Sequence, residues 1–266
     1  MMVLDDFLRR LAIENAVLIT VDATRGSVPR EKGAWMAVFS DESIGSVGGG
    51  QLEFTAQVEA RQRLAGHAGV TLERYALGPT LGQCCGGEVH LRYEPVGATD
   101  RDALRLRLQR VGHPVAIFGG GHVGEALVRV LSALPFDVRW IDSRDGIFPS
   151  TPPSNVRCEH SDPLQAEVAT LAPNSRVLIM SFSHAEDFEV VSGCLARQRL
   201  HADLPFVGLI GSRTKWSSFR QRLLARGFTA QELDHVTCPI GIAGIPGKLP
   251  EVIAVAVAAQ LLQFDC

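Results

Sequence analysis

The sequence predicts an α/β protein in which a small N-terminal α+β domain precedes a Rossmann-like domain with a doubly wound parallel sheet. Beyond residue 113, short apolar runs alternate with amphipathic runs, as strands and helices do around a parallel sheet. The first of these runs enters a glycine cluster, VAIFGGGHVGEALVRVL, over residues 115–131. A strand that enters such a glycine turn and leaves it as a helix is typical of dinucleotide-binding folds.

The N-terminal half has the pattern of a small α+β domain over residues 1–96. Apolar residues repeat at helical spacing between 3 and 11, which predicts a docking helix. Strand-like runs at 16–24 and 34–39, a helical run at 51–65, and alternating runs at 70–77 and 88–95 follow. Asp100 is placed to cap a short helix over 101–110. We therefore expect residues 97–112 to form a linker helix.

The C-terminal domain, residues 113–266, contains apolar strand-like runs separated by helical ones. Strands are expected at 114–118, 137–142, 155–160, 176–182 and 206–211, with a helix after most of them. The strands are apolar nearly throughout, as expected when helices cover both faces of a sheet. The last run, 249–264, is apolar on almost all sides, which predicts a buried helix, such as one between two subunits.

Composition excludes several classes of protein. The chain has 266 residues, a net charge of −3 and 46% apolar residues, so a dedicated nucleic-acid binder is not expected. Charged residues interrupt the N-terminal run, unlike the core of a signal peptide. The longest apolar stretch, 252–262, falls short of the roughly 18 residues that span a membrane. We expect a cytoplasmic protein with reduced cysteines.

The glycine cluster contains the complete GxGxxG pattern. Gly119, Gly121 and Gly124 fill its three glycine positions, and His122 lies between the second of these glycines and the helix predicted from Val123. Asp142 ends the next strand, where a ribose-binding acid is expected in such folds. These residues make a nicotinamide cofactor, NAD(P), one candidate ligand. In the alternative interpretation the glycines serve packing alone and Asp142 is a solvated residue at a strand end.

A dehydrogenase also needs catalytic groups, and the sequence supplies none that we can name. Tyr75 and Tyr93 lack a lysine four residues later, and no P-loop or Gly-x-Ser-x-Gly motif occurs. An NAD(P)-dependent oxidoreductase therefore stays the second hypothesis. The six cysteines show no CxxC spacing and no HExxH is present, so no metal site is expected.

Other short motifs supply candidate ligand-binding residues. GSVGGGQLE contains a second glycine turn before a helix, and LGQCCGGEV sets two thiols before two glycines. SFSHAEDFE and GSRTKW follow strands, so their polar residues fall at the carboxyl edge of the sheet. His184 could equally cap a helix, and the paired thiols could simply pack. The candidates from these motifs are Gly48, Gly49, Gly50, Cys84, Cys85, Gly86, Gly87, His184, Arg213 and Lys215.

Together these motifs resemble the XdhC/CoxI family, and within it the XdhC-type accessory proteins of xanthine dehydrogenase. The matching stretches run from residue 26 to 262 and include GSVPREKGAWMAV, LGQCCGGEVHLRYEP and CPIGIAGIPGKLPEVIAVAVAAQLL. Many CoxI-like relatives carry cysteine where this chain has Gln51, so no thiol role is expected at that position.

The resemblance implies a chaperone rather than a turnover enzyme. Such proteins bind molybdenum cofactor (molybdopterin) and protect it while a cysteine desulfurase supplies its sulfido ligand. They then insert it into the molybdenum subunit of apo xanthine dehydrogenase, and they usually form homodimers. Cys84 and Cys85 match the family's CCGG motif, and the other candidate residues named above are expected to hold this cofactor because it is polar and anionic.

Overall fold

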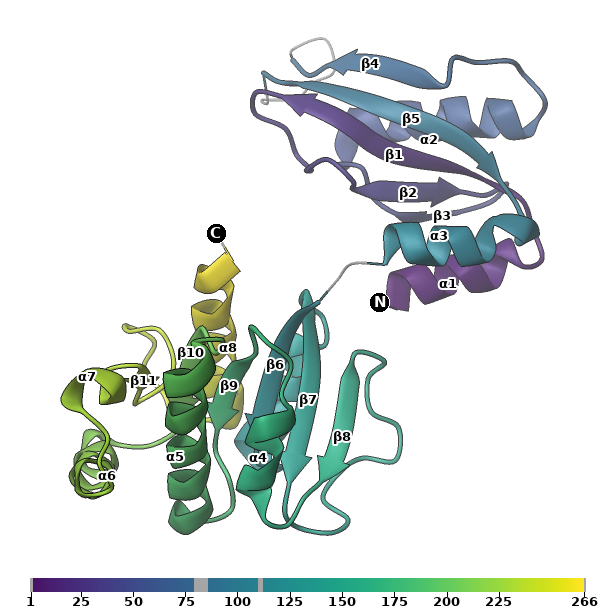
Figure 1. Cartoon of the computed structure of the whole chain (residues 1–266). Helices are drawn as coiled ribbons and strands as arrows, with labels where there is room; N and C mark the ends of the chain where they lie inside the picture. The colour runs from purple at the N-terminus through teal and green to yellow at the C-terminus, as the bar shows by residue number, and fades with distance from the viewer. Residues whose placement is uncertain (1, 79–85, 110–111, 266) are drawn as a thin grey trace. The chain divides into compact units, whose positions relative to one another are not determined.

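The computed structural model describes residues 2–78, 86–109 and 112–265. The chain divides into two compact units, unit 1 (Met1–Gln109) and unit 2 (Arg110–Cys266). Unit 1 contains an antiparallel sheet and unit 2 contains a parallel one (Figure 1). The predicted fold class, a small α+β region followed by a Rossmann-like parallel sheet, is confirmed.

Unit 1 is built on five antiparallel strands in the order β3-β2-β1-β5-β4. The longest pairing joins β1 to β5, from Ala16 opposite Val96 to Arg25 opposite Glu88, with an irregularity after Val21. The strands β2 and β4 flank this central pair. The strand bounds are β1 (Ala16–Arg25), β2 (Trp35–Val38), β3 (Ser43–Gly45), β4 (Leu72–Ala76) and β5 (Glu88–Val96).

Alternating residues of β1 contribute to two apolar cores. Val17 and Ile19 pack in the core that includes the buried residues of α2 (Gly50–Leu64). Leu18 packs in the core that includes α1 (Met2–Leu11). Because successive side chains of a strand point to opposite faces, α1 and α2 cover opposite faces of the sheet. The helix predicted near the N-terminus is thereby confirmed as α1.

The helix expected to link the two domains belongs to unit 1. It forms η2 (Ala98–Asp100) and α3 (Arg101–Leu108). Leu104 is buried in the core that α1 also lines. The Arg101 guanidinium donates a hydrogen bond of 2.9 Å to the carbonyl oxygen of Leu8 in α1. The chain from 97 to 108 thus packs on α1, where the sequence suggested only a connection.

Unit 2 contains six parallel strands in the order β11-β10-β9-β6-β7-β8. β6 lies in the middle, paired with β7 on one side and β9 on the other. The short strand β11 was not expected from the sequence. The strand bounds are β6 (His113–Phe118), β7 (Phe136–Asp142), β8 (Val156–His160), β9 (Arg176–Ile179), β10 (Phe206–Leu209) and β11 (Val236–Thr237).

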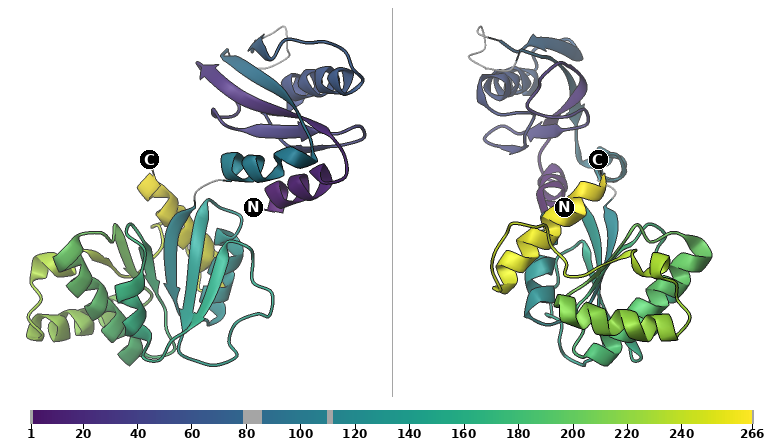
Figure 2. Two further views of the ribbon diagram at one scale, coloured as in Figure 1. Left: turned by 45° about the vertical axis from the view of Figure 1, so that its right-hand side comes forward. Right: turned by 90° about the vertical axis from the view of Figure 1, so that its left-hand side faces the viewer.

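Helices cover both faces of this sheet, as the apolar strands predicted. Val115 and Ile117 of β6 pack in one core with α4 and α8, and Ala116 and Phe118 pack in another with α5 and α6. α5 and α8 accordingly lie on opposite faces of the sheet (Figures 1 and 2). The helix bounds are α4 (His122–Leu131), η3 (Leu164–Thr170), α5 (His184–His201), α6 (Arg213–Ala225), α7 (Ala230–Leu233), α8 (Pro250–Leu262) and η4 (Gln263–Asp265).

The C-terminal helix α8 is buried on one face only. Ala254, Val257 and Leu261 lie in the core with α4, whereas Val255 and Leu262 are exposed. A location between subunits stays a prediction for this helix. Within the ranges that the structure describes, no helix combines the length and apolar character needed to cross a bilayer.

Leu104→Ala tests the assignment of α3 to unit 1. The substitution leaves a cavity in the core lined by α1, and we expect a loss of about 2–5 kcal/mol of stability in unit 1. Hydrogen exchange should become faster in α1 and α3 and stay unchanged in β6 and β9. Leu106→Ala is the matched control, because Leu106 is 81% exposed. Equal effects of the two variants would contradict the packing role.

Candidate functional site

The direction in which the chain adds strands to the parallel sheet reverses between the neighbouring strands β6 and β9. The chain runs outward from β6 through β7 to β8, returns to β9, and then runs the other way through β10 to β11. Loops at the carboxyl ends of β6 and β9 therefore separate, and open α/β sheets bind ligands at such a point. The helices α4, α5 and α6 also begin at this edge, with the unpaired N–H groups of their first turns.

The glycine turn after β6 passes close to the end of β9. Gly119 has a φ of +133°, and a Cβ atom there would lie 2.1 Å from the carbonyl oxygen of Met180. A Cβ atom on Gly124 would lie 2.1 Å from the carbonyl oxygen of Gly119. Gly121 differs, because a Cβ atom there would have nothing within 4 Å. Two motif glycines thus allow close packing, and the third leaves open space at the start of α4.

Asp142, at the end of β7, is buried and fully engaged by its own chain. Its Oδ1 accepts hydrogen bonds from the amide and Nε of Arg144, at 2.8 and 2.9 Å. Its Oδ2 accepts from the Gly120 amide at 2.5 Å and from Nη2 of Arg144 at 2.8 Å. Burial raises the pKa of Asp142, but these hydrogen bonds together hold it below its ordinary value. The carboxylate thus ties the glycine turn to the end of β7.

A second buried carboxylate organises the end of β9. Oδ1 of Asp187, in α5, accepts hydrogen bonds from the amide and the hydroxyl of Ser181, at 2.8 and 2.7 Å. Its Oδ2 pairs with the ammonium group of Lys215 at 2.5 Å, and that ammonium also donates to the carbonyl oxygen of Ile210 at 2.9 Å. The positive charge that the sequence offered to a ligand is therefore neutralised by Asp187.

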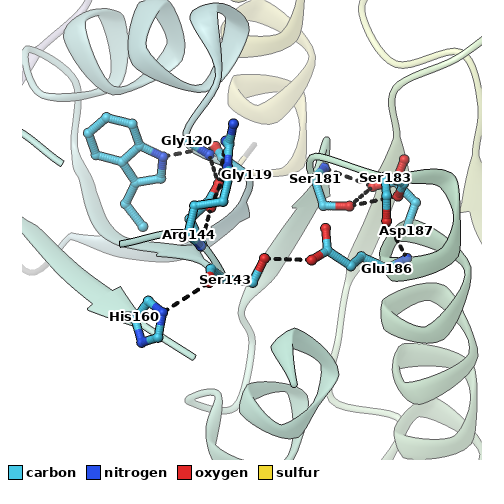
Figure 3. Close-up of polar contacts among 11 residues, drawn as sticks. Gly119, Gly120, Ser143, Arg144, His160, Ser181, Ser183, Glu186 and Asp187 are labelled. Atoms are coloured by element: carbon cyan, nitrogen blue, oxygen red, sulfur yellow. Dashed lines mark hydrogen bonds and ion pairs between the residues drawn. The ribbon is translucent and has the colours of Figure 1, made fainter. Parts of the chain in front are cut away.

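Glu186 is a third acidic residue at this edge, and only one of its two carboxylate oxygens has a hydrogen-bond partner among the described residues. Its Oε1 accepts a hydrogen bond of 2.5 Å from the Ser143 hydroxyl, so that α5 is joined to the segment after β7 (Figure 3). Its Oε2 is buried and has no hydrogen-bond partner among the described residues. The backbone amide of Glu186 is capped by the Ser183 hydroxyl at 3.2 Å. A buried acceptor of this kind marks a place where a donor on a ligand or a water fits.

The remaining candidates of unit 2 stand at the starts of helices. His122 opens α4, His184 opens α5 and Arg213 opens α6, and all three are exposed. Ser183 and Ser212 serve as N-caps of α5 and α6 through their hydroxyl groups. The helix-capping role considered for His184 therefore belongs to the serine before it. The structure thus brings these candidates to the same sheet edge as the glycine turn.

In unit 1, the second glycine turn binds the carboxylate of Glu53, a residue of the same chain. Oε2 of Glu53 accepts hydrogen bonds from the Ser46 hydroxyl at 2.6 Å and from the amides of Val47 and Gly49 at 3.0 and 3.1 Å. Burial raises the pKa of Glu53, but these hydrogen bonds lower it to a greater extent. The predicted anion cradle exists, with Glu53 as its occupant. It is formed by the turn that contains Gly48, Gly49 and Gly50.

The CCGG motif is described in part. Cys84 and Cys85 lie outside the described residues. Gly86 is exposed, and a Cβ atom on Gly87 would lie 2.2 Å from the carbonyl oxygen of Ser27. Gly87 thus allows β5 to begin against the end of β1.

The described cysteines are not set up as nucleophiles. Burial raises the pKa of the thiols of Cys158 and Cys238, and raises that of Cys194 to about 12. Among residues 2–78, 86–109 and 112–265, no group of three or more histidine, cysteine or acidic side chains could hold a metal ion.

The sequence did not identify three side chains at this edge as candidates, namely Arg144, Phe182 and Glu186. Arg144 engages Asp142 and places its guanidinium carbon 4.9 Å from the ring centroid of Phe182, which is 71% exposed. Glu186 supplies the unpartnered acceptor. The sequence offered two signals, Arg144 shortly after the end of β7 and Phe182 within SFSH, since both follow strands at the sheet edge. Helical position alone could not show that Glu186 would reach the segment after β7.

The comparisons with known sequences agree with this architecture. Residues 10–76 match the XdhC and CoxI family, and residues 115–261 match the XdhC Rossmann domain. The second match spans more than half of the chain. The chain therefore belongs to the XdhC/CoxI family.

The chain is also similar to one curated protein and to one solved structure. It is 28% identical over 247 residues to the uncharacterized protein YqeB of Escherichia coli strain K12, an alignment that takes in 90% of this chain and 42% of YqeB. The chain thus spans about two fifths of the length of that curated relative. A crystal structure described as a xanthine dehydrogenase from Bacillus halodurans matches with a TM-score of 0.75 and 20% identity, over 97% of this chain and 94% of that chain. At this identity the likeness shows the fold.

Lys215→Met tests the buried pair with Asp187. The variant leaves the Asp187 carboxylate buried without its counter-ion, which should cost unit 2 about 3–5 kcal/mol of stability. Hydrogen exchange of the β9 and β10 amides should report this loss. Lys248→Met, at an exposed position before α8, should have little effect. Unchanged protection in the Lys215 variant would show that the pair does not hold this edge together.

Glu53→Gln tests the anion cradle of unit 1 and should act in a pH-dependent way. The pKa of Glu53 is lowered on folding, so its contribution is complete above the ordinary value of about 4.3 and disappears as the pH falls through the folded-state value. The difference in unfolding free energy between wild type and variant should therefore be largest near neutral pH and shrink in acid. The exposed Asp102→Asn, on α3, is the control. A difference that grew in acid would have the wrong sign for this mechanism.

Proposed function

We propose that this protein is a maturation factor that binds molybdenum cofactor and delivers it to apo xanthine dehydrogenase. The observation that carries the proposal is the match of residues 115–261 to the XdhC Rossmann domain. The structural relative from Bacillus halodurans, described as a xanthine dehydrogenase, supports a link to that enzyme system. In this proposal the chain is a carrier of cofactor and does not itself turn over a substrate.

The edge of unit 2 has chemistry that suits such a cargo. The cofactor carries a pyranopterin, with N–H donors on its flat pyrimidine ring, and a terminal phosphate. The buried Oε2 of Glu186 offers an acceptor for a pterin N–H group. Phe182 offers an exposed ring on which a planar heterocycle can stack. The open space at Gly121 lets an anion approach the N–H groups at the start of α4.

The proposal assigns holding and shielding to this chain. A cysteine desulfurase would supply the sulfido ligand while the cofactor is bound, and apo xanthine dehydrogenase would receive the sulfurated product. The described thiols have raised pKa values and are poor candidates for carrying that sulfur. Cys84 and Cys85 stay predicted contacts of the cofactor.

Binding can be tested on the full chain under anaerobic conditions. Molybdenum cofactor released from a purified molybdenum enzyme would be mixed with the protein, and the retained molybdenum and pterin measured after gel filtration. We expect saturable retention with molybdenum and pterin in equal amounts. Absence of saturable retention would refute the proposal.

Gly121→Leu sharpens this test. The position has a φ of −74° and open space around the missing side chain, so the variant should fold with a loss of only about 1 kcal/mol. Its side chain would occupy the space over the start of α4, and we expect retention to fall at least tenfold. Ala133→Leu adds the same side chain at an exposed position beyond the other end of α4, and it should retain the cofactor normally.

A further inference from the structure

Arg144 is held in one orientation by its surroundings. Its Nε and Nη2 atoms donate to the two oxygens of Asp142, at 2.9 and 2.8 Å. The Phe182 ring lies 4.9 Å from the guanidinium carbon. Two hydrogen bonds and an aromatic contact together remove most of the freedom that an arginine side chain has at a surface. Figure 3 shows Arg144 extending alongside Gly119 and Gly120.

The other edge of this guanidinium makes no hydrogen bond with the described residues, and the Glu186 carboxylate is near enough to interact with its charge. An arginine has five N–H groups, and Asp142 takes two of them, which leaves three. Nη1 has no hydrogen-bond partner among the described residues, and the Arg144 side chain is 33% exposed. The Nη1–Nη2 edge can therefore donate two parallel hydrogen bonds to one anion, which is the arrangement that recognises phosphate.

Asp142 has no free acceptor position for the ribose hydroxyl contact that an acid at this strand end usually makes. An acid at this strand end binds the ribose hydroxyls in NAD-binding folds. In NADP-binding folds, a nearby arginine binds the 2′-phosphate on the ribose. A carboxylate has about four acceptor positions, and Asp142 has a donor at each of them. An unphosphorylated ribose would have to displace Arg144 or the Gly120 amide.

We propose that Arg144 is the anchor for a phosphate monoester and that Asp142 is its positioning residue. The site would then select ligands that carry a phosphate monoester over otherwise similar ligands that lack it. The inference rests on the proposed function in placing a ligand at this sheet edge. The phosphate could come from the terminal group of the pterin cofactor or from the ribose 2′-phosphate of NADPH.

The wild-type full chain distinguishes these sources without any substitution. Binding of molybdenum cofactor, NADPH and NADH would be measured by anaerobic equilibrium dialysis. We expect at least one of the two phosphate monoesters to bind, and NADH to bind at least tenfold more weakly than that ligand. Affinity for the monoester should also fall as the pH drops below about 6, where the phosphate dianion takes up a proton.

Arg144→Gln isolates the anchor. Loss of the charged donor should weaken binding of the phosphate monoester about ten- to hundredfold and leave the weak binding of NADH unchanged or improved. Arg129→Gln, whose side chain is 64% exposed on α4, is the matched control and should bind as wild type does. Because NADH binding is read on the same variant, a general loss of folding is separated from loss of the anchor.

The outcomes for the inference and for the proposed function differ. Binding of NADPH without binding of molybdenum cofactor would support the anchor and refute the maturation role. Equal binding of the cofactor by wild type and Arg144→Gln would refute the anchor and leave the maturation role standing. Two further outcomes would overturn the inference. In one, NADH binds as tightly as NADPH and molybdenum cofactor does not bind; in the other, none of the three ligands binds.

Discussion

The buried carboxylate of Asp142 is the constraint on which the rest of the carboxyl edge of the unit 2 sheet depends. It receives the Gly120 amide from the turn after β6 and the Arg144 guanidinium from the segment after β7. Removing it would leave a buried amide without its acceptor and an arginine without its orientation. The turn itself has little freedom to compensate, because Gly119 lies against the carbonyl oxygen of Met180.

The same principle recurs across the edge and in unit 1. Asp187 holds Ser181 and Lys215, and Glu53 fills the glycine turn that precedes α2. In each place a carboxylate of the chain satisfies donors that sequence motifs offer to a ligand. Donors engaged in this way hold the backbone still, and recognition falls to the groups left over. In unit 2 these include the Nη1–Nη2 edge of Arg144, the second oxygen of Glu186 and the space at Gly121.

The sequence was sufficient for the fold class and for most of the strands and helices, but not for β11, for the packing of α3 on α1 or for the contacts of the site. Apolar strands in alternation with helices predicted the parallel sheet of unit 2, since burial of both faces requires that pattern. The GxGxxG motif correctly placed a strand–turn–helix from β6 to α4. Sequence spacing could not reveal that Lys215 would meet Asp187, or that Glu53 would turn back onto its own turn, because such contacts depend on side-chain reach after folding. Position 142 was correctly placed at a strand end, while its occupied oxygens became visible only with Arg144 in place.

A glycine-rich turn is therefore a weak guide to the ligand by itself. Gly119 and Gly124 are required by contacts with Met180 and within the turn, whether or not a nucleotide binds. Only Gly121 lacks a packing reason, and it alone leaves room for an anion at the helix start. The choice of ligand then falls to the side chains that surround this space. Since the acid is sequestered and a rigid arginine edge is exposed, the electrostatics favour a doubly charged phosphate over neutral ribose hydroxyls. Under the proposed function, the pairing of Asp142 with Arg144 would suit this Rossmann-like fold to carrying a phosphorylated cofactor.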